Sequence, residues 1–366
     1  MVALGSDDPH VAIAVTCGGG ITALKALVRR RGLPRLLARE GSRAALSPTT
    51  SAFRWGHASL TPASASQRSA PARDDEQRRP TRNAAGGATI LHPVPRPPDL
   101  PDFRRPPVDE VAIGLQFQVP VPGFTDAHVG VFWQQVKERY RRAESQPRIE
   151  SPPEVLDGSA PQAFQLSVFP GATGGRTFLV SDDDSYLLQI QNNRFYRNWR
   201  RREDEYPHFD ELGEAFREEY GELCKFLTSE ALAIPTLLQL EVTYINWIPD
   251  LAVTEFLRVG SGADLHVPGV SELPQDQNWA SRYLVHRENG TPLARLHVQC
   301  VSALRVLADG PVPGNQMSLT FLAPWRIDEP FDDELKEMLA MARNAIVRGF
   351  TDLTTATAHE HWERIQ

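Results

Sequence analysis

After residue 106 the chain runs through one order of periodic segments twice, and this repeat constrains the fold more than any other feature. The first run is a strand, a helix, three strands and a long helix, at 109–118, 125–142, 163–169, 176–182, 186–196 and 209–232. The second run has the same order, at 237–248, 250–260, 280–287, 293–304, 317–324 and from residue 331 onward. Runs of strands followed by a helix predict an α+β fold with antiparallel sheets. We therefore expect two similar β-α-β-β-β-α halves, 106–236 and 237–366, with the long helices packed on one face.

The strand and helix predictions rest on two different periods of apolar residues. In segment 109–118, Val111, Ile113 and Leu115 occupy alternate positions, which is the period of a half-buried strand. Segment 209–232 has apolar residues three or four positions apart, which is the period of a helix with one buried face. They are Phe209, Leu212, Phe216, Tyr220, Leu223 and Leu227. The repeat lies in the order of the elements and not in residue identity.

The first 105 residues differ in composition from the rest of the chain. They contain 16 of the 39 basic residues and 8 of the 46 acidic ones, so the remaining residues carry 23 basic and 38 acidic side chains. Rich in Arg, Pro, Ala and Ser, the stretch buries too little apolar area to offset the entropy of ordering it. We predict a disordered basic tail over residues 1–105. A targeting or nucleic-acid-binding arm is one interpretation of it, and a mis-assigned start of the protein is the favoured one.

Many polar positions of the predicted strands carry amides and hydroxyls instead of Lys and Glu. These positions are Gln116, Gln118, Gln165, Ser167, Gln189, Gln191, Asn193, Gln239, Glu241, Thr243, Arg295, His297, Gln299, Ser318 and Thr320. Because an amide both donates and accepts hydrogen bonds, the set suits a partly enclosed binding surface. An ordinary sheet face in water has the same period of two. The sequence leaves both interpretations open.

Arginines and aromatic residues are interleaved between positions 194 and 202. They are Arg194, Arg197, Arg200, Arg201 and Arg202, with Phe195, Tyr196 and Trp199. Such a composition is typical of surfaces that contact phosphates and stack on bases. The acidic stretch 203–220 that follows would instead pair with these arginines and repel a phosphate backbone. We favour this structural role, and bidentate binding of an anionic ligand is the alternative.

Four segments carry a resemblance to a known family: "PPVDEVAIGLQF", "LQIQNNRFYRNWRRREDEYPHFDELGEAF", "LEVTYINWI" and the closing "TATAHEHW". They extend over residues 104–366 and leave the tail out, and "QNNRFYRNW" followed by "YPHF" is the most specific part. In these segments the chain resembles a sporadically distributed family of uncharacterised bacterial proteins. Since that family has no established activity, the resemblance implies a bacterial, cytoplasmic protein and contributes no catalytic residue.

One histidine lies among groups that suit catalysis. His297 has Arg295 beside it on the polar strand face, and it could form an acid/base pair with Glu241 if their two strands meet. His359 and His361 are two positions apart and fall on different helix faces, which does not suit a shared metal. The phosphate-loop, dinucleotide and serine-hydrolase motifs are missing from the sequence. We expect no metal and no cofactor.

Cysteine usage and charge indicate the compartment. The three cysteines, Cys17, Cys224 and Cys300, are far apart in the sequence and odd in number, which favours a reducing environment. A net charge of −7 gives no overall attraction to nucleic acid or to acidic membranes. No apolar run has the length of a membrane span. We expect a cytoplasmic protein that does not bind membranes.

These features favour a non-enzymatic binding or interaction protein, whose partner is an unidentified protein or a small polar or anionic ligand. The predicted binding residues are Gln189, Gln191, Asn193, Arg194, Arg197, Trp199, Arg200, Gln239 and Gln299. A nucleic-acid-binding module is the first alternative, and it requires exposed arginines at 197 and 200 beside Phe195 or Tyr196. An enzyme is the second alternative, and it requires Glu241, Arg295 and His297 within hydrogen-bond reach of one another.

Overall fold

The computed structural model describes residues 96–156, 167–168, 175–202, 205–259, 277–307, 310–326 and 331–366. The predicted tail lies outside the described residues as far as position 95. Residues 96–105 are described, and they pack on the C-terminal helices. Leu100 is fully buried, and the ring of Phe103 contacts the rings of Phe350 and Trp362, with centroids 5.8 and 6.3 Å away. The fold therefore includes residues that we assigned to the tail, because Leu100 is buried and Phe103 is half-buried against the rest of the protein.

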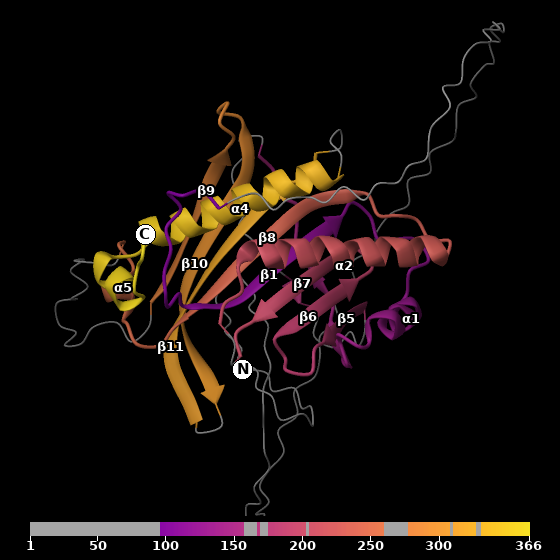
Figure 1. The fold of residues 1–366 in the computed structure, drawn as a ribbon, viewed down its shortest axis with the longest axis horizontal. Coiled ribbons are helices and arrows are strands. Elements are labelled where there is room, and N and C mark those ends of the chain that lie inside the picture. Colours follow the sequence, from indigo (N-terminus) through magenta and orange to yellow (C-terminus); the bar gives the residue numbers. More distant parts are fainter. Residues whose placement is uncertain are drawn as a thin grey trace, which may run out of the picture. The chain divides into compact units, whose positions relative to one another are not determined.

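One antiparallel sheet of nine strands runs through both halves of the chain (Figure 1). The first half contributes β1 (Val108–Phe117), α1 (Asp126–Val136), β2 (Arg142–Pro147), β3 (Ile149–Glu150), β4 (Ser167–Val168), β5 (Gly175–Val180), β6 (Tyr186–Gln191), β7 (Arg194–Arg200) and α2 (Phe209–Ser229). The second half contributes β8 (Leu237–Ile248), α3 (Val253–Phe256), β9 (Asn278–His286), β10 (Pro292–Leu307), β11 (Gly310–Pro324), α4 (Phe331–Leu353) and α5 (Ala356–His361). The short strands β3 and β4 pair with each other outside the main sheet.

The strand order reflects the repeat in the sequence. It is β2-β5-β6-β7-β1-β8-β11-β10-β9, so β5-β6-β7-β1 on one side matches β9-β10-β11-β8 on the other. The halves join where β1 pairs with β8, and Gly114 lies opposite Glu241 in this pair. The predicted α+β class and the antiparallel pairing are confirmed, and both halves share one sheet.

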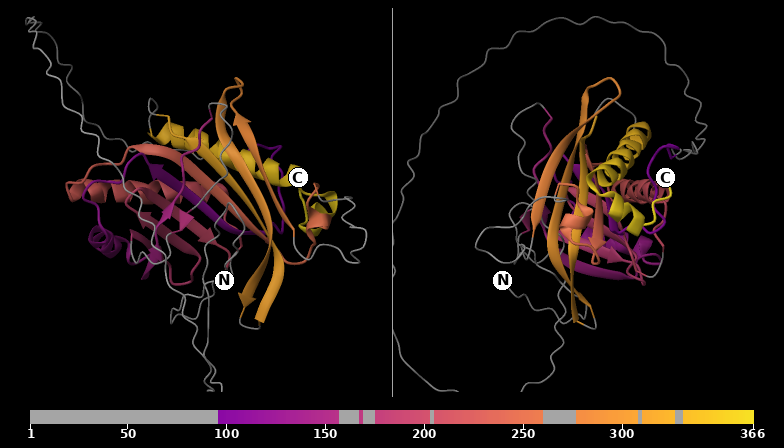
Figure 2. Two further views of the ribbon diagram at one scale, coloured as in Figure 1. Left: turned by 180° about the vertical axis from the view of Figure 1, so that it is seen from behind. Right: turned by 90° about the vertical axis from the view of Figure 1, so that its left-hand side faces the viewer.

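The long helices α2 and α4 lie on the same face of the sheet (Figures 1 and 2). Phe195 of β7 packs against Phe216 of α2, with ring centroids 5.9 Å apart. Leu296 of β10 and Leu319 of β11 lie against Gly349 of α4. Because neighbouring residues of a strand point to opposite faces, these apolar residues direct their polar neighbours away from the helices. None of the described helices is both long and apolar enough to cross a membrane.

The arginine segment lies inside the sheet and not at a strand end. Our prediction of one strand over 186–196 is wrong, because β6 and β7 form a hairpin there with Asn192 and Asn193 in the turn. Gln191 faces Arg194 across this turn, and β7 continues between β6 and β1. Two asparagines between strand-like runs are a hairpin signal, which the apolar positions on both sides obscured.

Two other predicted elements also differ from the structure. The helix expected over 125–142 ends at Val136, and after a turn β2 begins at Arg142 beside β5. Most of the strand expected over 163–169, including Gln165, lies outside the described residues. Within it, Ser167–Val168 pairs with β3 and not with the main sheet.

Candidate functional site

A row of polar residues crosses six strands on the face opposite the long helices. Residues directly opposite each other in a sheet project from the same face. The register therefore aligns six side chains from β2 to β8, which we name the polar row: Gln146, Arg176, Gln191, Arg194, Gln116 and Gln239. The last five are nearly fully buried, with exposed fractions of 1% to 8%. Because these side chains are buried, another part of the chain must cover the polar row, and it must also supply hydrogen-bond partners.

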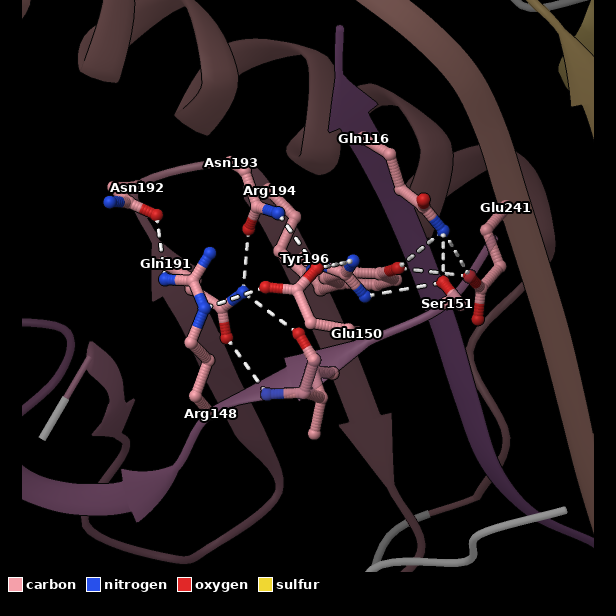
Figure 3. A network of polar contacts seen from close by, with 11 residues as sticks. Gln116, Arg148, Glu150, Ser151, Gln191, Asn192, Asn193, Arg194, Tyr196 and Glu241 are labelled. Carbon is pink, nitrogen blue, oxygen red and sulfur yellow. Dashed lines mark hydrogen bonds and ion pairs between the residues drawn. The ribbon is translucent and has the colours of Figure 1, made fainter. Parts of the chain in front are cut away.

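Residues 148–156, which we name the strap, cross the polar row (Figure 3). The N–H of Ile149 donates to Gln191 Oε1 at 3.1 Å, and the carbonyl of Ile149 accepts from Gln191 Nε2 at 2.9 Å. A side-chain amide that pairs with both main-chain groups of one residue recognises an extended backbone, whatever side chain that residue carries. The predicted binding residue Gln191 thus holds a piece of polypeptide from its own chain.

The next two strap residues contact the centre of the polar row (Figure 3). Glu150 Oε2 accepts hydrogen bonds from Asn193 Nδ2 at 3.1 Å and from Arg194 Nη2 at 3.3 Å. Ser151 Oγ accepts from Gln116 Nε2 at 3.0 Å and from Arg194 Nη1 at 3.4 Å. The structure therefore brings the predicted residues Asn193 and Arg194 together, around a carboxylate of the strap.

The far end of the strap reaches β8 and β10. The N–H of Glu154 donates to Gln239 Oε1 at 2.8 Å, and its carboxylate pairs with Arg295 and with His297 Nε2, the latter at 2.9 Å. Arg295 also donates to the carbonyl of Val155 at 3.1 Å. Burial by itself raises the pKa of Glu154, but the hydrogen bonds and charges of His297 and Arg295 outweigh burial and hold this pKa below its ordinary value.

The predicted acid/base pair of Glu241 and His297 does not form. β11 lies between β8, which carries Glu241, and β10, which carries His297. The backbones of β8 and β10 are therefore about 10 Å apart, which is twice the spacing of neighbouring strands. The carboxylate beside His297 is that of Glu154. Glu241 instead accepts hydrogen bonds from Tyr196 Oη at 2.9 Å and from Gln116 Nε2 at 3.2 Å. The enzyme alternative therefore lacks the geometry that it requires.

Tyr196 reaches Glu241 by crossing over Gly114 of β1. A Cβ atom at position 114 would lie 2.0 Å from Tyr196 Cδ1 and 2.2 Å from Cε1, so a side chain there is incompatible with the ring. Burial, with a further contribution from Glu241, raises the pKa of the Tyr196 hydroxyl far above its ordinary value. The hydroxyl therefore stays protonated and donates to the carboxylate of Glu241.

Two of the predicted binding residues belong to the helix face. Arg197 Nε donates to Glu219 of α2 at 2.9 Å. Trp199 is 1% exposed and packs edge-on against Tyr206, with ring centroids 5.3 Å apart. Arg197 stabilises the contact between the sheet and α2, which is the structural role that we favoured for the arginine segment, whereas Trp199 packs against the residues that lead into α2.

The nucleic-acid alternative loses the exposed groups that it requires. The side chain of Arg197 is 11% exposed and that of Arg200 is 12% exposed, and Arg200 pairs with Glu110 at 3.5 Å. Phe195 is fully buried and Tyr196 is 5% exposed, so neither ring is available to stack on a base.

Gln189 and Gln299 complete the set of predicted residues on the polar face. Gln189 Nε2 donates to Asn198 Oδ1 at 2.8 Å, and Gln189 Oε1 accepts from Arg176 Nη1 at 3.2 Å. Gln299 is half-buried in β10, opposite Ser318 of β11.

Sequence reasoning missed four residues of this site: Arg176, Glu150, Ser151 and Glu154. The strap has neither the period of a strand nor that of a helix, so its acidic residues are interpreted as part of an ordinary surface loop. Arg176 shares its face of β5 with Phe178 and Val180, so the amide-rich alternation that marks the other strands is missing there.

Comparison with known proteins does not show a family. No family model matches the chain, and no curated protein matches it. A crystal structure of DynU16, a protein in the dynemicin biosynthetic locus, matches with a TM-score of 0.19 and 13% sequence identity, over 70% of this chain and 99% of that chain. A likeness at this level carries no argument about fold or function. The resemblance to the sporadically distributed bacterial family stays a prediction.

Proposed function

We propose that the protein is a non-enzymatic binding protein whose polar row binds an extended polypeptide segment of a partner, at the place that the strap occupies. The observation that carries the proposal is the pairing of Gln191 with both main-chain groups of Ile149. In peptide recognition, main-chain hydrogen bonds supply affinity, and contacts to particular side chains supply selectivity. The selective contacts here are those to Glu150 and Glu154, so the partner segment carries acidic groups at corresponding positions.

The docking of the strap is weak enough to be exchanged. Among the nine residues of the strap, only Ile149 is buried, and Val155 is 49% exposed. Each neutral hydrogen bond to the sheet stabilises docking by about 0.5–1.5 kcal/mol and each one to a charged group by about 1.5–3 kcal/mol, whereas ordering each residue of a segment costs about 1–2 kcal/mol. The two contributions nearly cancel for a segment held mainly by polar contacts. A partner with additional apolar contacts can therefore displace the strap.

The two prolines of the strap indicate what kind of segment fits. Pro152 and Pro153 are exposed, and they connect the contacts of Ser151 to those of Glu154. Proline has no N–H and favours an extended backbone, so this part needs no acceptor from the sheet. A partner segment with proline at these positions enters the site already extended, which lowers the entropy cost of binding.

The test uses the full chain and a fluorescein-labelled peptide with the strap sequence RIESPPEVL. Fluorescence anisotropy is measured with the Glu150→Ala/Glu154→Ala protein, whose own strap has lost its ionic contacts. We expect this variant to bind the peptide. The wild-type protein should bind it at least about tenfold more weakly, because a tethered strap competes at an effective concentration in the millimolar range.

The control adds Gln191→Leu to the double variant, which removes the pairing with the main chain and should abolish binding. A peptide of the same composition in scrambled order controls for attraction by charge alone. If the double variant retains its circular-dichroism spectrum and does not bind the peptide, the proposed function is wrong.

The compartment and the family are part of the same proposal. The scarcity of cysteine and its odd number support the cytoplasm, and the segments quoted above support the sporadically distributed family of uncharacterised bacterial proteins. Fractionation of cells that express the tagged full chain would test the compartment, and recovery in a membrane fraction would contradict it.

A further inference from the structure

Two buried arginines flank Gln191 in the polar row. Arg176 of β5 and Arg194 of β7 are 8% and 2% exposed, and each lies directly opposite Gln191. Both side chains project from the same face of the sheet, which is the face that the strap covers. Burial, with the positive charge of Arg194 adding to it, lowers the pKa of Arg176 to about 10. The two positive charges therefore belong to the same buried patch around Gln191.

One carboxylate serves more than one of the arginines in this region. Glu150 pairs with Arg194 at 3.3 Å and with Arg148 of the strap at 2.6 Å. A single negative charge thus faces two guanidinium groups before Arg176 is considered.

Arg176 has no ion pair with any acid among the described residues. Its Nη1 donates to Gln189 Oε1 at 3.2 Å, and its guanidinium group lies over the ring of Phe178, 4.9 Å from the centroid. The Nε atoms of Arg176 and Arg194 are both buried without a hydrogen-bond partner in the described structure. Buried charge without a counter-charge is costly, and buried groups whose pKa is perturbed are candidates for functional sites.

We propose that Arg176 and Arg194 form a subsite for a phosphate monoester of the ligand, and that Glu150 occupies this subsite when the strap is docked. The proposal rests on the proposed function of the polar row and names the chemistry of its ligand. A phosphate monoester carries about 1.5–2 negative charges at neutral pH and three acceptor oxygens. One such group satisfies two guanidinium forks, whereas the carboxylate of Glu150 supplies one charge.

The subsite is accessible from solvent once the strap leaves. The side chain of Glu150 is 36% exposed, whereas the side chain of Arg194 beneath it is 3% exposed. A phosphate that replaces this carboxylate therefore contacts Arg194 while the rest of the ligand remains outside. Gln189 and Phe178 already hold the guanidinium group of Arg176 in place, so binding requires little reorganisation.

The first experiment compares two peptides by fluorescence anisotropy on the full-length Glu150→Ala/Glu154→Ala protein. One peptide is RIESPPEVL, and the other has phosphoserine in place of its first glutamate. We expect the phosphopeptide to bind about ten- to a hundredfold more tightly, the range for hydrogen bonds to charged groups. Adding Arg176→Gln should remove this preference, so that the phosphopeptide and the unmodified peptide bind this variant with equal affinity. Arg176→Lys, which keeps the charge and the fold but loses the fork, should keep part of the preference.

The second experiment measures binding of phenyl phosphate by calorimetry, which separates the subsite from the polypeptide function. We expect phenyl phosphate to bind the Glu150→Ala protein. It should bind the matched control Glu154→Ala more weakly, because Glu150 still fills the subsite, and it should not bind when Arg176→Gln is added to Glu150→Ala.

If phenyl phosphate binds in this pattern and neither peptide binds, the site is one for small phosphate esters, and the polypeptide function alone is refuted. If RIESPPEVL binds tightly, the phosphopeptide binds no more tightly than RIESPPEVL, and phenyl phosphate does not bind, the subsite alone is refuted. Absence of binding by all three ligands refutes both.

Discussion

The crossing of Tyr196 over Gly114 predicts a large loss of stability in Gly114→Ala. The added Cβ would lie 2.0 Å from Cδ1 of the ring, whereas carbon atoms in contact are about 3.5–4.0 Å apart. The ring must therefore move by about 1.5 Å, and overpacking of this kind costs about 1–3 kcal/mol. The movement also breaks the hydrogen bond from the tyrosine hydroxyl to Glu241, which adds about 1.5–3 kcal/mol because the acceptor is charged. We expect the free energy of unfolding to fall by about 3–5 kcal/mol.

Urea denaturation followed by tryptophan fluorescence measures this free energy. Gly130→Ala is the matched control, because a Cβ at that position of α1 meets no atom within 4 Å. Alanine there should stabilise the protein by about 0.5–1 kcal/mol relative to glycine. In a Tyr196→Ala background, where the ring is missing, Gly114→Ala should cost less than about 1 kcal/mol. A cost of several kcal/mol in both backgrounds would show that the clash with the ring is not the cause.

Three further predictions follow from buried groups described above. Glu219 accepts hydrogen bonds from Tyr140 at 2.5 Å and from Arg197 at 2.9 Å. Glu219→Ala removes the carboxylate that pairs with the buried guanidinium group of Arg197, so the free energy of unfolding in urea should fall by about 3–5 kcal/mol. A fall of less than about 1 kcal/mol would contradict the pairing. The pKa of Glu154 is depressed, so its stabilisation of strap docking is present above the ordinary carboxyl pKa and is lost as the pH falls through the depressed one. The protection factor of the Glu154 amide hydrogen should fall on that acidic side, and protection that does not change there would be inconsistent with the ion pairs. Leu100→Ala should cost about 2–5 kcal/mol, whereas Val119→Ala, at a residue 60% exposed, should stay within about 0.5 kcal/mol; equal effects would mean that residues 96–105 do not belong to the folded core.

The two faces of the sheet could be predicted from the sequence, but the pairing of its strands could not. The alternation of Leu115 with Gln116 specifies which side chain is apolar, and burial of that side chain under the helices decides the face. Register depends on contacts between residues far apart in the chain, such as Gly114 and Glu241. The prediction of a catalytic pair failed for this reason, since nothing local in the sequence places β11 between Glu241 and His297.

The strap was beyond sequence reasoning for a different physical reason. Its contacts come from side-chain amides and guanidinium groups, which accept many partners and impose no spacing on them. Gln191 was predicted as a binding residue because of its alternation, yet its partner Ile149 lies in a segment without any period. The arginine segment shows the same limit: Arg194 and Arg197 differ in role because they point to opposite faces, and the unrecognised hairpin turn hid this difference.

The path of the strap has a consequence for the internal motion of the molecule. Its first contacts, with Gln191 and Asn193, are made to the first half of the chain, and its last contacts, with Gln239 and His297, are made to the second half. The strap thus bridges the line along which β1 meets β8 and restrains the twisting of one half against the other. A polypeptide that replaces the strap must bridge the same line, whereas a small phosphate ester at Arg194 contacts the first half alone. The two kinds of ligand would leave the protein with different torsional stiffness, so relaxation measurements along β1 and β8 would tell which kind is bound.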